Sequence, residues 1–166
     1  MAYVKNEKGI AYSEVKSFET QVLDVPELAT PTIPEANITI SSALFNSSIV
    51  SNNNSDIKAK GFCYSSTNNK PTIEDNPQPI EGNTFSLQVN ELKYGTTYYV
   101  RAYATNGVGT GYSTSVSFTT TNILIPALNH VAISNITTDG ATFTATITST
   151  NNGTIKEKGF CWSTTN

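Results

Sequence analysis

Apolar and polar positions alternate most regularly in the middle of the chain, over residues 97–105. The positions fall into two interleaved sets, Tyr98, Val100 and Ala102 in one and Tyr99, Arg101 and Tyr103 in the other. A period of two is expected of a β-strand whose two faces meet different surroundings. The pattern therefore predicts a strand with its even-numbered side chains in a core and its odd-numbered side chains in solvent.

Similar patterns around this stretch predict only strands. We expect them at Ile33–Ile40, Ala43–Ser51, Ile57–Ser66, Thr84–Val89, Thr97–Thr105 and Tyr112–Thr120, with a weak further strand near Pro71–Glu74. Asn106, Gly107 and Gly109 tolerate positive φ, so the last two main strands should form a hairpin. Phe85, Leu87 and Val89, together with Ala43, Phe45 and Ile49, should meet Tyr98, Val100, Val116 and Phe118 in the core.

The strand Ile57–Ser66 has two possible phases. One phase buries Phe62 and Tyr64, and the other buries Cys63. The large area of two aromatic rings favours the first phase, because each is worth about 2 kcal/mol when removed from water. An unpaired cysteine is itself among the most buried residue types, which favours the second.

The chain repeats itself. Residues 2–20 align without a gap on residues 102–120, and residues 127–166 align on residues 29–68, which pairs His130 with Thr32. A period near 100 residues is the length of one immunoglobulin-like sandwich domain. We therefore expect the tail of one repeat at residues 1–23, a complete repeat at 29–121 and the beginning of a third at 127–166.

Short segments with proline separate the repeats. Gln21–Thr30 contains Pro26 and Thr121–Leu128 contains Pro126, which is typical of short and fairly stiff linkers. A rod-like array is the expected result. The residues after Met1 have neither the basic start nor the apolar core of a secretory signal, so either the chain is intracellular or its natural N-terminus lies upstream. The repeat alignment favours the second interpretation.

Leu92, Gly95 and Tyr98 have the spacing of a corner in which a tyrosine hydroxyl bonds back to the loop before its strand. The stretch LKYGTTYYVRAYATN, with GFCYSST before it and GYSTSVSFTT after it, resembles the F-strand region of fibronectin type III domains. It is most similar to the fibronectin-like repeats of surface proteins and lipoproteins of Bacteroidetes bacteria. The resemblance implies an all-β fibronectin type III-like sandwich in tandem repeats at a cell surface.

The composition excludes several classes of partner. Charged residues make up 14% of the chain, and the net charge is −3 with a pI near 5.1. Nucleic-acid binding needs clustered Lys and Arg, so we expect no nucleic-acid partner. No apolar run approaches the ~20 residues that cross a bilayer. A surface rich in Ser, Thr and Asn suits an extracellular β protein.

The sequence offers little catalytic chemistry. Cys63 and Cys161 occupy equivalent positions in successive repeats, about one domain apart, and should be lone structural thiols. The single His130 belongs to no repeated site. We therefore expect no catalytic residues, no cofactor and no enzymatic activity. The possible glycosylation sites are expected by chance in such a composition and stand at Asn37, Asn46, Asn53, Asn135 and Asn152.

Two groups of acidic residues could in principle bind calcium, which prefers several oxygen ligands. One group is a loop with Glu74, Asp75, Asn76, Glu81 and Asn83, and the other surrounds the first linker with Asp24, Glu27 and Glu35. Neither group has the spacing of a calcium-binding loop. Solvated carboxylates are the favoured interpretation, and we expect no metal site.

The candidate ligand face is formed by Tyr99, Arg101 and Tyr103. Aromatic rings beside an arginine can stack on sugars or on peptides. Cross-strand pairing on an exposed sheet is the simpler explanation for the same residues. The favoured function is thus a non-catalytic spacer or adhesive module in contact with adjacent repeats, and the alternative is a module that binds carbohydrate or protein through this face.

Overall fold

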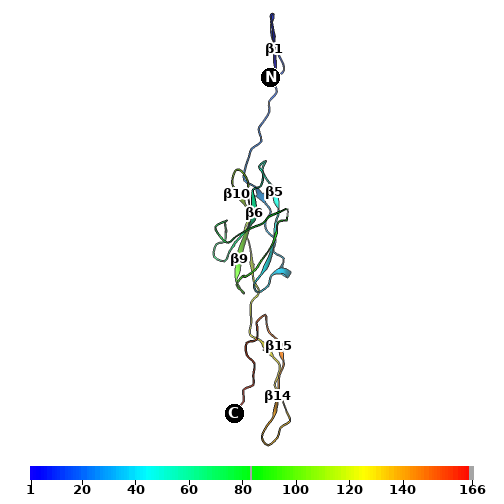
Figure 1. The fold of residues 1–166 in the computed structure, drawn as a ribbon, viewed down its shortest axis with the longest axis vertical. Coiled ribbons are helices and arrows are strands. Elements are labelled where there is room, and N and C mark those ends of the chain that lie inside the picture. Colours follow the sequence, from blue (N-terminus) through cyan, green and yellow to red (C-terminus); the bar gives the residue numbers. More distant parts are fainter. Residues whose placement is uncertain (83, 165–166) are drawn as a thin grey trace.

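The computed structural model describes residues 1–82 and 84–164, and strands account for nearly all of its regular structure. Figure 1 shows an elongated chain with a thin hairpin at the N-terminus, a broader body in the middle and a narrower part that carries the C-terminus. Within the described residues, no helix is long and apolar enough to cross a membrane.

The middle body is a two-layer β-sandwich. One layer consists of β7 (Pro77–Pro79), β6 (Ala59–Ser65), β9 (Thr97–Thr105) and β10 (Thr110–Tyr112), with β11 (Val116–Thr119) also paired to β9. The other layer pairs β4 (Ala43–Asn46) with β8 (Ser86–Val89) and gains a bridge from Thr32 to Asn46. A short β3 (Glu27–Leu28) pairs with β5 (Ile49–Ser51). The predicted all-β fibronectin type III-like sandwich is confirmed.

Aromatic side chains from both layers fill the core. The Phe45 ring of β4 makes edge contacts with Phe62 and Phe118, with ring centroids 5.6 Å apart in both pairs. Such edge-to-face pairs add stabilisation beyond the burial of their area. Most predicted inward positions are confirmed, because Val89, Tyr98 and Val100 are buried in the same cluster and Phe85, Leu87 and Val116 pack against it. Ile49 is the exception, since it lies in β5 opposite Leu28 and is not part of this cluster.

The expected strand at Ile33–Ile40 is wrong. A short 3-10 helix, η1 (Glu35–Asn37), occupies this segment and follows Pro34. Proline has no N–H to donate to a sheet and holds φ near −65°, so it ends the pairing after the single bridge at Thr32. The weak strand predicted at Pro71–Glu74 is also misplaced, because pairing with β6 begins at Pro77.

Two predicted strands are each divided into two. Ala43–Ser51 becomes β4 and β5, which pair with different partners. Tyr112–Thr120 becomes β10 and β11, separated where the Ser113 hydroxyl accepts the N–H of Ala102 at 2.9 Å. Alternating hydrophobicity continues through such a break, so the pattern alone does not reveal it.

Side chains on both faces of β6 are buried. Phe62 belongs to the core and Tyr64 packs against it, which confirms the favoured phase. Cys63 is nevertheless fully buried on the opposite face, where its thiol donates to the carbonyl oxygen of Pro71 at 3.3 Å. The segment 66–79 folds back and covers this end of the outer face.

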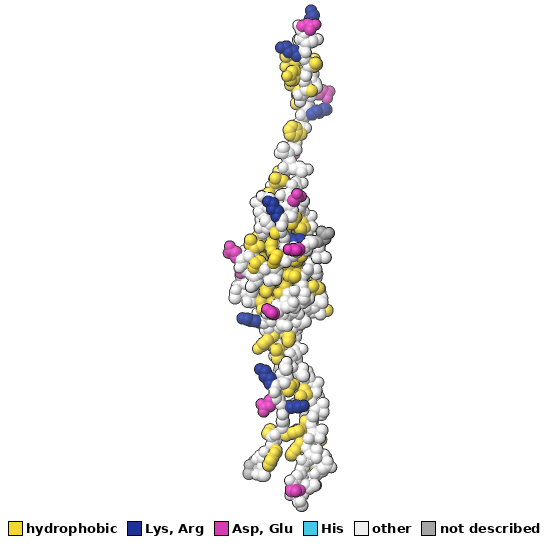
Figure 2. All heavy atoms as spheres, viewed as in Figure 1, with side chains coloured by type: hydrophobic (Ala, Val, Ile, Leu, Met, Phe, Trp, Pro, Cys, Tyr) yellow, Lys and Arg dark blue, Asp and Glu magenta, His cyan; other side chains and the backbone are white. Residues whose placement is uncertain are grey.

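The flanking parts reproduce pieces of the middle body. At the N-terminus, β1 (Tyr3–Asn6) and β2 (Gly9–Tyr12) pair Tyr3 with Tyr12, as β9 and β10 pair Tyr103 with Tyr112. The C-terminal part pairs β12 (Ala127–Leu128) with β15 (Ile147–Ser149), and β13 (Ala132–Ser134) with β14 (Thr142–Thr144). Figure 2 shows apolar side chains at the surface of both flanking parts, where Phe18 is 87% and Trp162 is 76% exposed.

The strand registers correct the alignment of the third repeat. Leu28 pairs with Ile49 and Leu128 pairs with Ile147, so Leu128 corresponds to Leu28. The ungapped alignment of residues 127–166 on 29–68 is therefore wrong at its start, because the third part lacks two residues where the middle body has η1. His130 consequently corresponds to Thr30 and not to Thr32.

Candidate functional site

The structure does not bring Tyr99, Arg101 and Tyr103 together as one solvent-facing surface. All three lie on β9 and face away from the core, but Tyr103 is only 6% exposed. Its ring lies over Gly61 of β6, where a Cβ atom would come within 2.9 Å of the ring. The expectation of solvent exposure is thus wrong for Tyr103, and its burial raises the pKa of its hydroxyl.

Arg101 is tied to the neighbouring strand. Its Nε donates to the carbonyl oxygen of Ser113 at 2.8 Å, and its guanidinium lies 4.6 Å from the ring centroid of Tyr112. The Tyr112 hydroxyl in turn accepts the N–H of Ile73 at 3.3 Å. These contacts link the hairpin to the covering segment. Tyr99 remains half-buried, between Ser65 and Ser117 on the adjacent strands.

The predicted corner is present. The Tyr98 hydroxyl accepts the N–H of Lys93 at 3.0 Å, and its ring stacks on Phe118 with centroids 5.7 Å apart. Leu92 is buried, and Gly95 has φ +56°, which a glycine adopts without steric cost. The hydrogen bond that the sequence predicts is thereby confirmed, and its contribution to stability is a prediction treated below.

Neither cysteine forms a disulfide among the described residues. Burial raises the pKa of the Cys63 thiol to about 11, although the nearby Arg101 charge acts in the opposite direction. A thiol with this pKa is protonated at neutral pH and is a poor nucleophile. Cys161 is exposed in the C-terminal segment, and His130 is exposed as well.

The acidic residues serve local structure. The Asp75 carboxylate accepts the side-chain amide of Asn68 at 2.9 Å and the N–H of Thr72 at 3.0 Å, which closes its loop. Asp24 accepts the N–H of Val25 at 2.7 Å. The other candidate carboxylates are exposed, at Glu27, Glu35, Glu74 and Glu81. Asn83 lies outside the described residues, and the described ones contain no group of three or more potential metal ligands.

Sequence reasoning missed the asparagines that hold the first linker. The side-chain amides of Asn53 and Asn54 donate to the carbonyl oxygens of Val25 and Val22 at 2.7 and 3.2 Å. A third amide, from Asn106 in the β9–β10 turn, donates to the carbonyl oxygen of Asp24 at 2.7 Å. Asn53 and Asn54 have positive φ values of 50° and 61°, a conformation that asparagine tolerates.

The second linker is held in the same way. Asn151 and Asn152 donate to the carbonyl oxygens of Ile125 and Asn122 at 2.5 and 3.0 Å, and their φ values are 50° and 66°. In both repeats a serine precedes the pair and orients it. Ser51 and Ser149 each donate to the first asparagine of the pair at 2.6 Å. The repeated pattern Ser-x-Asn-Asn at residues 51–54 and 149–152 was the available signal.

Comparison with known proteins gives structural likeness only. No protein-family model matches the chain, and no curated protein matches it. A fourth fibronectin type III domain of a human protein shares 20% identity, with 69% of this chain and 94% of that chain covered and a TM-score of 0.49. The sixth such domain of human fibronectin type III domain containing protein 3 shares 23% identity over 68% and 98% of the chains, with a TM-score of 0.46. Titin domains A168–A170 share 19% identity over 71% and 39%, with a TM-score of 0.44.

Proposed function

We propose that this chain is a non-catalytic spacer segment of a tandem fibronectin-like array, exposed on the outside of a cell and carrying or presenting other domains. The observation that supports this proposal best is the serial arrangement of the three parts along one axis (Figure 1). Each part reuses strands of the same repeat, so every added repeat lengthens the chain.

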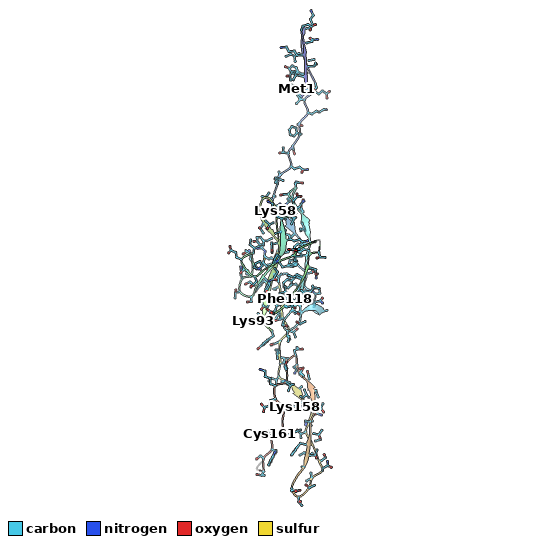
Figure 3. The ribbon with its side chains drawn as sticks, in the orientation of Figure 1. Met1, Lys58, Lys93, Phe118, Lys158 and Cys161 are labelled. Carbon is cyan, nitrogen blue, oxygen red and sulfur yellow. The ribbon has the colours of Figure 1, made fainter. Side chains whose placement is uncertain are left out.

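The middle body supports this function because its connections leave from opposite ends. Figure 3 shows Lys58 toward the N-terminal hairpin and Lys93, beside the tyrosine corner, toward the C-terminal part. The preceding segment is bound near Lys58 through Asn53 and Asn54. The following segment is bound near Lys93, where Gly95 donates to the carbonyl oxygen of Thr121 at 3.2 Å. A domain whose two linkers leave from opposite ends separates the parts that they connect, and so acts as a spacer.

The surface chemistry supports the extracellular placement in this proposal. Hydroxyl side chains pair between neighbouring strands at the surface, as Thr97 and Thr119 do at 2.9 Å. Few ion pairs are needed, since charged residues make up only 14% of the chain. Proteolytic shaving of intact cells tests this placement, and protection of the segment from an added protease would contradict it.

Small-angle X-ray scattering of the full chain tests the spacer itself. We expect a pair-distance distribution with a long tail, and a maximum dimension well above that of the middle body alone. The middle body alone, residues 22–122, is the control, because a compact domain of that size gives a distribution without such a tail. A distribution as compact as that of the control would contradict the proposal.

Binding of a carbohydrate or protein is the second candidate function. It is favoured by the half-exposed Tyr99, which lies on the same face as the Arg101–Tyr112 pair. Titration with oligosaccharides, observed by NMR, tests it through shifts of the backbone amides around Tyr99, which should be lost in Tyr99→Ala. Shifts that are unchanged in Tyr99→Ala would place the binding elsewhere.

A further inference from the structure

We propose that the Ser-x-Asn-Asn loop of each repeat is an inter-repeat lock, whose partner is the extended backbone that enters from the preceding repeat. The lock deepens the proposed spacer function and rests on it, because it fixes the direction in which one repeat follows another. It consists of residues 51–54 at the first joint and residues 149–152 at the second.

The lock recognises backbone and not side chains. Its amides donate to carbonyl oxygens of residues 22 and 25 at the first joint, and of residues 122 and 125 at the second. The linkers differ in sequence, with Val-Leu-Asp-Val at residues 22–25 and Asn-Ile-Leu-Ile at residues 122–125. Identical contacts with different linkers indicate a device that works at every joint of an array.

The loop is preorganised by its own hydrogen bonds. In each repeat the serine hydroxyl donates to the side chain of the first asparagine and also accepts its backbone N–H, at 3.0 Å in both loops. Both asparagines of each loop have positive φ. A loop that is ordered by its own hydrogen bonds loses little further freedom when it holds the linker.

A proline follows the residues that the lock binds. Pro26 is buried against β10, and a Cβ atom on Gly111 would lie 1.9 Å from its carbonyl oxygen. The fixed φ of proline and the close approach of the strand prevent the linker from swinging away. Pro126 stands at the corresponding place in the second linker, where it is exposed because the described residues 127–164 contain no counterpart of β10.

The second linker forms hydrogen bonds with both the middle body and the C-terminal part. Thr121 donates to the carbonyl oxygen of Thr39 at 2.9 Å and accepts the N–H of Gly95 at 3.2 Å, so it is part of the middle body. The next residue, Asn122, already accepts the amide of Asn152. Leu124 completes the joint by donating to the carbonyl oxygen of Asn151 at 3.0 Å. No free residue separates the tyrosine corner of one repeat from the lock of the next.

The test measures the width of a distance distribution across the second joint by pulsed electron spin resonance. Spin labels are placed at Ser117→Cys in β11 and Thr148→Cys in β15 of the full chain, with Cys161→Ser to remove the exposed thiol. The lock is removed by Asn151→Gly and Asn152→Gly together, since glycine keeps the positive φ but lacks the amide. We expect the distribution to widen at least twofold.

The matched control is Asn76→Gly. Asn76 also has a positive φ, of 41°, and its amide donates to the carbonyl oxygen of Tyr64 at 3.1 Å, but it lies in the covering segment away from both joints. We expect the distance distribution between labels at residues 117 and 148 to stay as narrow in Asn76→Gly as in the parent chain. An unchanged width in the lock variant, or equal widening in the control, would overturn the proposal.

A second measurement covers the case in which the lock variant loses the structure of the C-terminal part. Labels at Gln21→Cys and Ser117→Cys report on the first joint, where the complete sandwich supports the lock. Asn53→Gly with Asn54→Gly should widen this distribution while the thermal transition of the sandwich is retained. An unchanged width of this distance distribution would contradict the lock, even if X-ray scattering shows that the chain is elongated. The lock and the spacer function can therefore fail independently.

Discussion

The hydroxyl of Tyr98 accepts the backbone N–H of Lys93 at 3.0 Å, across the corner that connects the two layers of the sandwich. The same corner receives a second hydrogen bond from the Thr120 hydroxyl, which donates to the carbonyl oxygen of Lys93 at 2.6 Å. Both backbone groups of Lys93 are thus satisfied by side chains. The corner is held at its apex by Lys93 and not by regular strand pairing.

Tyr98→Phe should lower the free energy of unfolding by about 1 kcal/mol, because the ring is kept and one hydrogen bond is lost. Chemical denaturation of residues 22–122 measures the change. Tyr94→Phe is the control, since Tyr94 lies in the same loop and is 58% exposed. Equal denaturation midpoints for the two variants would show that the corner contributes nothing to stability.

Gly61→Ala should destabilise the middle body by about 1–3 kcal/mol, because the added methyl group has no space. It would lie 2.2 Å from the carbonyl oxygen of Gln78 and 2.9 Å from the ring of Tyr103. Gly159→Ala is a control at the equivalent position of the third part, where a Cβ atom meets nothing within 4 Å. Thermal unfolding compares them, and a neutral Gly61→Ala would mean that segment 66–79 does not cover this strand.

The stability of the middle body should fall as the pH rises from about 9 to about 11. Burial raises the pKa of Cys63 from 9.0 to about 11, so the unfolded chain loses this proton first and is favoured at high pH. Burial raises the pKa of Tyr64 and Tyr103 in the same direction. Below pH 9, Cys63 is protonated in both the folded and the unfolded chain, so its contribution to the free energy of unfolding no longer depends on pH.

Cys63→Ala isolates that contribution. Its denaturation midpoint should depend less steeply on pH between 9 and 11 than the midpoint of the parent. Thiol titration gives an independent measurement, in which the exposed Cys161 reacts at pH 8 and Cys63 reacts only on unfolding. Rapid labelling of both cysteines in the folded chain would contradict the burial of Cys63.

Removal of metal ions and reducing conditions should leave the melting temperature unchanged. A sandwich with the aromatic core described above buries enough apolar surface to fold without cross-links. Thermal melts with EDTA, with a reductant and with neither are expected to coincide. A fall of several degrees with EDTA would point to calcium at the Asp75 loop or at the first linker.

The sequence by itself determined the features that depend on local pattern. The strand at Thr97–Thr105 was predicted with its observed bounds, and so were the inward positions around Phe45. The tyrosine corner follows from the spacing of Leu92, Gly95 and Tyr98. Alternation and spacing act over a few residues, so they can be recognised without knowledge of the distant parts of the chain.

Only the tertiary structure decided what covers the second face of the sheet. Alternation shows that two faces differ, but it does not show that residues 66–79 fold over Cys63 and Tyr103. The asparagine locks were hidden for the same reason, because Asn53 meets the carbonyl oxygen of Val25 only after β3 and β5 have paired. Contacts between segments distant in sequence depend on chain closure and packing, and no local pattern of residues encodes them alone.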